Sequence, residues 1–100
     1  MQFLIIAHDG TDPEAADRRA AARPAHIARG DAQVRTGEQV FGAALLCDEG
    51  EMIGSVMVVE APDRAALDAW LAAEPYVTGD VWRDIQVTPC RVGPSFAEKA

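Results

Sequence analysis

Two long apolar segments separated by a tight turn constrain the fold of this chain more than any other feature. Residues 38–47 and 51–60 are rich in Val, Leu, Ile, Ala and Met, and Asp48-Glu49-Gly50 separates them. So short a connection joins antiparallel strands, because parallel neighbours need a crossover of a dozen or more residues. The two segments therefore predict a β-hairpin whose strands are apolar on both faces.

Two further strands and one helix follow from simple periodicities. Residues 2–8 and 80–92 alternate in the two-residue period of a strand, with one set of side chains on each face. Residues 63–73 carry apolar side chains at helical spacing. Asp63 is suited to cap the start of this helix, and Pro75 to stop it.

The segment between the first strand and the hairpin is rich in Ala, Arg, Asp and Glu, which favours helix. Pro24 lies in its middle, lacks a backbone donor and disfavours helix at the preceding residue. We therefore expect two helical pieces, 13–22 and 24–36, kinked or broken just before Pro24. Asp12 is a good N-cap for the first piece, and Gly37 is a suitable stop for the second.

The order strand, helix, strand, strand, helix, strand predicts an α+β fold of the ferredoxin-like βαββαβ type. Its four-stranded antiparallel sheet carries both helices on one face. The other face of the two central strands would still be apolar and would need a cover. A second copy of the sheet is the simplest cover, so we expect a homodimer. The whole chain, 1–100, is predicted to be one domain that ends in a polar tail over residues 93–100.

Charge and composition exclude several classes of function. The chain has 16 acidic and 9 basic residues and a formal net charge of -7, which argues against nucleic acid and anionic membrane surfaces as partners. No apolar run is long enough to span a bilayer. Residues 1–7 lack a basic leader and indicate a strand rather than a signal peptide, so the cytoplasm is the expected location. Cys47 and Cys90 are predicted to be free thiols.

Histidine is the informative residue type for chemistry. His26 is the natural general acid or base, and the alternative is a helix histidine with satisfied hydrogen bonds. His8 is predicted to be a residue at a strand end. Two separated histidines and two scattered cysteines lack the spacing of metal ligands, and there is no glycine-rich phosphate loop. Neither a metal nor a cofactor is therefore expected.

Four motifs together point to a known family: Arg23-Pro24-Ala25-His26-Ile27, Gly54-Ser55, Glu74-Pro75-Tyr76-Val77 and Val87-Thr88-Pro89. In order and spacing they resemble the YciI-like (YCII-related) family over nearly the whole domain. The resemblance implies a dimeric ferredoxin-like α/β-barrel fold and a His-Asp active site. It also implies that one relative is a dehydrochlorinase acting on a chlorinated hydroquinone, while most members have no assigned reaction. Glu74 departs from the family pattern, which has Asp at this position.

The expected catalytic residues are His26 and Asp9. Asp9 follows the first strand and matches the acidic residue of the family there. A carboxylate at that strand end can orient an imidazole near the start of the second helical piece. The alternative for Asp9 is an Asx turn before Gly10. The sequence leaves open whether Asp9 or Glu74 is the partner of His26.

Four more residues are candidates for substrate binding. Arg23 is suited to hold an anionic ligand, or else to form a surface ion pair. Ser55 is suited to bond a substrate oxygen, or else to pair within the sheet. Glu74 either points into a half-buried cleft, where burial would raise its pKa, or swings into water. Tyr76 either offers its phenol to a ligand or plugs the end of the helix.

Two hypotheses of function follow from these residues. The first is a small cytoplasmic enzyme of lyase or hydrolase type. It would use His26 and Asp9 for cofactor-free proton transfer on a small anionic or aromatic molecule. The second is a non-catalytic dimeric module that binds a small molecule or supports a partner protein. A cleft with converging polar groups beside His26 would favour the enzyme, and a filled or flat surface would favour the module.

Overall fold

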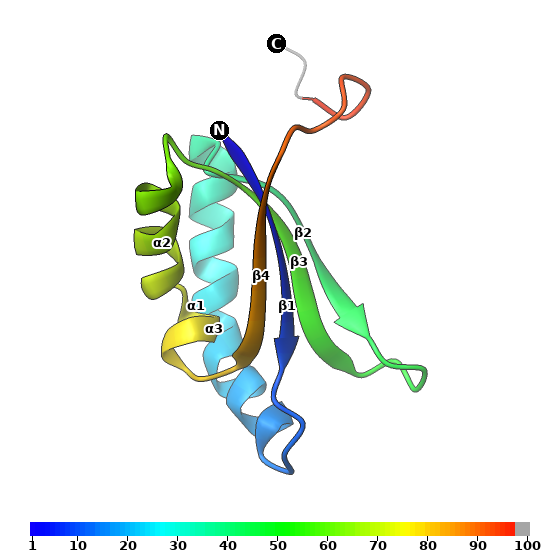
Figure 1. The fold of residues 1–100 in the computed structure, drawn as a ribbon. Coiled ribbons are helices and arrows are strands. Elements are labelled where there is room, and N and C mark those ends of the chain that lie inside the picture. Colours follow the sequence, from blue (N-terminus) through cyan, green and yellow to red (C-terminus); the bar gives the residue numbers. More distant parts are fainter. Residues whose placement is uncertain (98–100) are drawn as a thin grey trace.

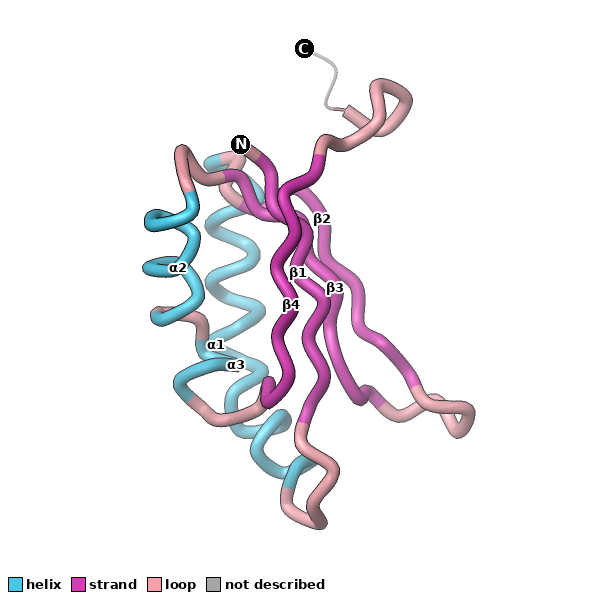
Figure 2. Tube along the Cα trace, in the orientation of Figure 1, coloured by secondary structure: helices cyan, strands magenta, loops and turns pink. Residues whose placement is uncertain are grey.

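The sheet places its strands in the order β2-β3-β1-β4, and every neighbouring pair is antiparallel (Figure 1). These assignments come from a computed structural model that describes residues 1–97. The elements are β1 (Gln2–Asp9), α1 (Ala15–Thr36), β2 (Gln39–Leu46), β3 (Met52–Glu60), α2 (Arg64–Ala72), α3 (Pro75–Thr78) and β4 (Trp82–Cys90). All helices lie against one face of the sheet (Figure 2). The predicted ferredoxin-like fold is confirmed.

The core lies between the helices and the inner face of the sheet, the face that the helices cover. On β1, alternate side chains starting at Phe3 point inward and are at most 1% exposed. In the antiparallel register they stand beside inward-facing residues of β3 such as Met57 and Val59. Leu67 of α2 and Tyr76 of α3 close the core from the helical side. Fully burying an apolar side chain of this size contributes about 1.5–3 kcal/mol, so this face dominates the stability of the fold.

The outer face of the sheet, away from the helices, is apolar along the hairpin as the sequence predicts, but β2 is an edge strand, and the two central strands are β3 and β1. The outward residues of β1 pair in register with Val56 and Val58 of β3, which in turn neighbour β2. Phe41 on β2 pairs with Val58 and is 54% exposed. The residues that the structure describes leave this face uncovered. The expected homodimer would cover it and stays a prediction.

The predicted interruption of the first helix before Pro24 is wrong, because α1 runs through Pro24 as one helix. Pro24 cannot donate to the carbonyl of Ala20, four residues earlier. Both residues lie on the exposed side of α1, where water can satisfy that carbonyl. The helix ends as predicted at Gly37, whose positive φ of 85° closes the last turn through a bond to Val34.

The three helix starts differ in how far the sequence predicted them. Asp12 is not the N-cap of α1, which begins three residues later. Its carboxylate accepts the Glu14 N–H at 3.3 Å and also binds the Arg18 guanidinium. Asp63 caps α2 as predicted, accepting a backbone N–H of the first turn at 2.8 Å. The short helix α3 was not predicted. Pro75 ends the preceding segment and also opens α3, with Glu74 at the N-cap position.

Three further expectations concern the remaining parts of the chain. Cys47 and Cys90 are free and half-buried, as predicted. Within residues 1–97, no helix combines the length and apolar character needed to cross a membrane. The predicted polar tail, residues 93–100, is described only as far as residue 97, and 98–100 lie outside the described residues.

Candidate functional site

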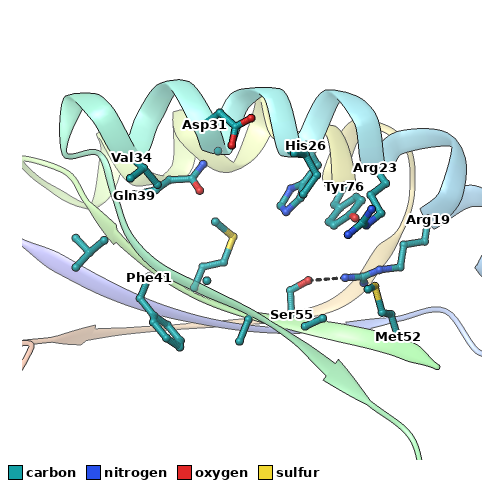
Figure 3. A pocket seen from close by; sticks show the side chains of 17 residues that line it. Arg19, Arg23, His26, Asp31, Val34, Gln39, Phe41, Met52, Ser55 and Tyr76 are labelled. Carbon is teal, nitrogen blue, oxygen red and sulfur yellow. Dashed lines mark hydrogen bonds between the residues drawn. The ribbon is translucent and has the colours of Figure 1, made fainter. Parts of the chain in front are cut away.

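A pocket of about 430 Å³ opens between α1 and the β2–β3 side of the inner face (Figure 3). Side chains of α1 line it at intervals of three or four residues, which places them on one side of the helix. They include Arg19, Arg23, His26, Gly30 and Val34, with Ile27 and Asp31 next to them. The opposite wall includes Ser55 and Met57 of β3, and Tyr76 of α3 lies beside them. One helical stripe thus delivers all the basic groups of the pocket.

His26 is held by Glu74, which reaches it from the N-cap of α3. His26 Nδ1 is hydrogen-bonded to Glu74 Oε1, and Arg29 Nη1 donates to Glu74 Oε2 at 2.7 Å. The Glu74 side chain is 0% exposed, whereas that of His26 is 16% exposed. An ionised carboxylate only accepts hydrogen bonds, so Nδ1 carries the hydrogen in this pair. The other ring nitrogen, Nε2, has no hydrogen-bond partner among residues 1–97, and the imidazole lines the pocket (Figure 3).

The ionisation of Glu74 follows from a competition between burial and its partners. Burial opposes the charged form, but the hydrogen bonds and charges of His26 and Arg29 outweigh it, and the pKa of Glu74 falls below its ordinary value. From the sequence, burial in a half-buried cleft is expected to raise this pKa, and the direction is the reverse. Arg29, which no local spacing connects to Glu74, also donates to the Trp70 carbonyl at 2.9 Å and lies over the Trp70 ring.

Tyr76 forms the wall next to the imidazole. Its ring stacks on His26 with 3.9 Å between centroids and an interplanar angle of 13°. The Arg19 guanidinium carbon lies 4.7 Å from the centroid of the Tyr76 ring. Burial raises the pKa of the Tyr76 phenol, against the opposing charges of Arg19 and Arg23. Tyr76 is therefore both a buried plug and a pocket-lining phenol that stays protonated at neutral pH.

Asp9 pairs with Arg19 and not with His26, so the predicted orientation of the imidazole by Asp9 does not occur. Arg19 Nη1 lies 3.0 Å from both carboxylate oxygens of Asp9, and the two side chains are 8% and 6% exposed. Arg19 Nη2 donates to Ser55 Oγ at 3.2 Å. Trp82 Nε1 donates to the same oxygen at 3.1 Å. Asp9 thus fixes an arginine that in turn holds Ser55.

Arg23 is exposed at the pocket, and no ion pair of Arg23 is found among residues 1–97. The surface pair that the sequence allowed as its alternative role is thus absent from the described contacts. The same residues contain no cluster of three or more His, Cys, Asp or Glu side chains able to hold a metal ion. The polar side chains that line the pocket are those of Arg19, Arg23, His26, Asp31, Gln39, Ser55 and Tyr76.

The sequence profile of the YCII-related domain matches residues 1–91. The chain belongs to the YCII-related family. Protein YciI of Escherichia coli O6:H1 and Protein YciI of Shigella flexneri are each 28% identical to it, over 89% of this chain and 95% of the relative. The family resemblance carried by the sequence motifs is therefore confirmed.

Two solved structures share the fold of this YCII-related domain. One is 5-chloro-2-hydroxyhydroquinone dehydrochlorinase from Burkholderia phenoliruptrix AC1100 in complex with 2,5-dihydroxybenzoquinone. It has a TM-score of 0.78 and 21% identity, over 95% of this chain and 98% of that chain. The other is an antibiotic biosynthesis monooxygenase, with a TM-score of 0.53 and 21% identity, over 94% and 100% of the two chains. Identities this low establish the fold alone.

Sequence reasoning missed two arginines of the site, Arg19 and Arg29. The spacing of both arginines along a helix would have placed them at the site. Arg19 precedes Arg23 by four residues and His26 by seven, and Arg29 follows His26 by three, so all lie on or beside one face of α1. The expected break before Pro24 separated Arg19 from this face. A continuous helix would have joined them.

Proposed function

We propose that this YCII-related protein is a cofactor-free acid–base enzyme of lyase or hydrolase type. It acts on a small anionic or hydroxylated ring molecule. The observation that carries the proposal is the His26–Glu74 pair: Nδ1 is bound to a buried carboxylate, and the imidazole lines a pocket of about 430 Å³. A pocket with converging polar groups favours this enzyme over the non-catalytic module.

In this proposal His26 Nε2 takes a proton from the substrate. Glu74 fixes the imidazole by one ring nitrogen and stabilises the positive charge that develops on it, while Arg29 holds Glu74 in place. In an elimination, the electron pair of the bond to the abstracted proton forms the new double bond. The bond to the leaving group breaks, and the leaving group departs as an anion with the electron pair of that bond. The protonated imidazole then returns its proton to solvent. Acid–base catalysis of this kind contributes about 10²–10⁴-fold to a rate.

The substrate class is supported by the walls of the pocket. Its volume is near the lower end for small-molecule sites, which suits a single ring with substituents. Tyr76 supplies an aromatic surface, and Arg23 supplies a positive charge for a phenolate or carboxylate. The dehydrochlorinase with the same fold is named for a hydroxylated, chlorinated ring and holds a dihydroxybenzoquinone. We extend this class of molecule to the present chain as part of the proposal.

Asp9 takes a different role from the one that the sequence suggested. It acts on the substrate only through Arg19 and Ser55, as a positioning residue. A homodimer that covers the outer face, and a cytoplasmic location, complete the proposal. Light scattering coupled to size-exclusion chromatography tests the dimer, and a stable monomer at micromolar concentration would contradict it.

A screen of hydroxylated and chlorinated hydroquinones, followed by absorbance and chloride release, tests the enzyme. His26→Gln should lower any turnover by about 100-fold or more. His8→Gln is the matched control, because His8 is the only other histidine, lies on an exposed strand end and is absent from the pocket. If His26→Gln and His8→Gln both retain the wild-type rate, His26 is not the base.

A further inference from the structure

The hydroxyl of Ser55 is held by two donors at once. Its oxygen lies 3.2 Å from Arg19 Nη2 and 3.1 Å from Trp82 Nε1, and Ser55 is 3% exposed. A guanidinium and an indole can only donate, so both bonds are directed to lone pairs of the Ser55 oxygen. The two lone pairs are then occupied. The Ser55 hydrogen has to point in a third direction.

No acceptor for that hydrogen is found among residues 1–97. Ser55 stands in the middle of the sheet, and its register partners are Ala7 and Ala44, which have no polar side chains. A buried polar hydrogen without a partner costs about 1–3 kcal/mol. Ser55 lines the pocket, so the space that remains for an acceptor is the pocket itself (Figure 3).

The charges around Ser55 favour an acceptor that is negative. Arg19 is neutralised by Asp9, yet its Nε is buried without a hydrogen-bond partner. Arg23, on the same side of the pocket as Arg19 in Figure 3, has no ion pair within the described residues. The carboxylate of Asp31 also lines the pocket, but it lies farther along α1, beyond His26 (Figure 3). The end near Ser55 is thus rich in donors and positive charge.

We infer that Ser55, Arg19 and Arg23 form a subsite for an anionic oxygen of the ligand, such as a phenolate, enolate or carboxylate oxygen. The Ser55 hydroxyl donates its hydrogen to that oxygen, Arg19 fixes and polarises the hydroxyl, and Arg23 balances the charge. This inference rests on the pocket of the proposed function and adds the orientation of the ligand. The anionic oxygen lies beside Ser55, and the proton to be transferred lies beside His26.

Binding of two ring molecules of similar size tests the subsite. The first probe is 2,5-dihydroxybenzoquinone, which presents acidic oxygens, and the second is 1,4-diaminobenzene, which presents N–H donors. Calorimetry at neutral pH should show tighter binding of the first probe to the wild-type protein. Ser55→Ala should weaken that binding by about 10- to 100-fold, the range for a hydrogen bond to a charged group, and should leave the diamine unaffected.

The two tryptophans give an internal spectroscopic comparison. Trp82 Nε1 donates to Ser55, whereas Trp70 Nε1 donates to Gln33 at 2.7 Å and does not line the pocket. The benzoquinone probe should therefore shift the indole N–H resonance of Trp82 and leave that of Trp70 in place. Trp70→Phe assigns the two signals.

Ser55→Ala also removes the acceptor of two donors, so its melting temperature must be measured. If that variant does not fold, Arg23→Gln replaces it, because Arg23 is exposed and unpaired in the described structure. Arg23→Gln should weaken the binding of the benzoquinone probe about fivefold, and this loss of affinity should be smaller at high salt.

The outcomes separate the subsite from the enzyme. Ser55-dependent binding without any His26-dependent turnover supports the subsite and overturns the acid–base enzyme. His26-dependent turnover with unchanged probe affinity in Ser55→Ala or Arg23→Gln overturns the subsite and retains the enzyme. The subsite is also overturned if the wild-type protein prefers the diamine, or if the Trp82 resonance does not move.

Discussion

Glu74 and Asp9 are both buried carboxylates beside the pocket, and each binds an arginine of α1. The two pairs differ in the pocket residue that they hold. Glu74 binds Arg29 and also holds the imidazole of His26. Among residues 1–97 the Asp9 carboxylate binds only Arg19, which in turn donates to the Ser55 hydroxyl. The same carboxylate–arginine chemistry therefore fixes a proton-transfer group in one case and a hydrogen-bond donor in the other. The ring of Tyr76 contacts both His26 and Arg19.

The strongest test of this comparison is turnover in two amide variants. Glu74→Gln should lower His26-dependent turnover by about 100-fold, because the amide no longer stabilises the protonated imidazole. Asp9→Asn should lower it less than about tenfold per folded molecule, because Asp9 has no contact with His26. Steady-state rates, scaled to the folded fraction from circular dichroism, give both values. Equal losses in the two variants would remove the distinction between the carboxylates.

The free energy of unfolding should also fall more in Glu74→Gln than in Asp9→Asn. Glu74→Gln leaves Arg29 charged at a site where the carboxylate is 0% exposed, and we expect a loss of about 3 kcal/mol in the free energy of unfolding. Asp9→Asn affects one partner, Arg19, where Glu74→Gln affects both Arg29 and His26, and the Asp9 carboxylate is slightly exposed, so we expect about 2 kcal/mol. Urea unfolding at neutral pH measures both. A Glu74→Gln protein as stable as the wild type would mean that Glu74 is not ionised in the folded state.

The pH dependence of stability should separate Glu74 from the exposed acids. Its folded-state pKa is lowered from an ordinary value of 4.5, so its contribution is present above that pH and is lost as the pH falls through the folded value. Wild-type protein should therefore lose stability between neutral and acid pH more steeply than Glu74→Gln. Exposed Asp80, whose pKa is also lowered by Arg83, contributes equally to both proteins. Parallel curves would contradict the role of Glu74.

The smallest effect is expected for an exposed pair of the same chemistry. Arg64 and Asp68 form an i,i+4 ion pair at 2.9 Å on α2, and their side chains are 56% and 59% exposed. Asp68→Asn should change the free energy of unfolding by less than about 0.5 kcal/mol, since water screens the pair and solvates the remaining charge. A loss comparable to that of Asp9→Asn would show that burial does not set the strength of these pairs.

Local sequence determined the elements and most of their ends. Alternation predicted β1, β3 and β4, and the Asp48-Glu49-Gly50 turn joined β2 to β3, with Gly50 at a positive φ of 85°. Asp63 caps the start of α2 and Gly37 the end of α1, as predicted, because capping depends on backbone groups within a few residues. His26, Ser55 and Tyr76 were also singled out from the sequence, and all three line the pocket.

Only the tertiary structure decided which groups meet. Glu74 is 48 residues from His26, and Ser55 is 36 residues from Arg19, so no local spacing rule relates them. The passage of α1 through Pro24 was also a tertiary outcome, because the proline faces water while the opposite side of the helix packs on the sheet and pocket. Backbone preferences act over a few residues and are written in the sequence, whereas the partner of a buried charge is set by packing between distant segments.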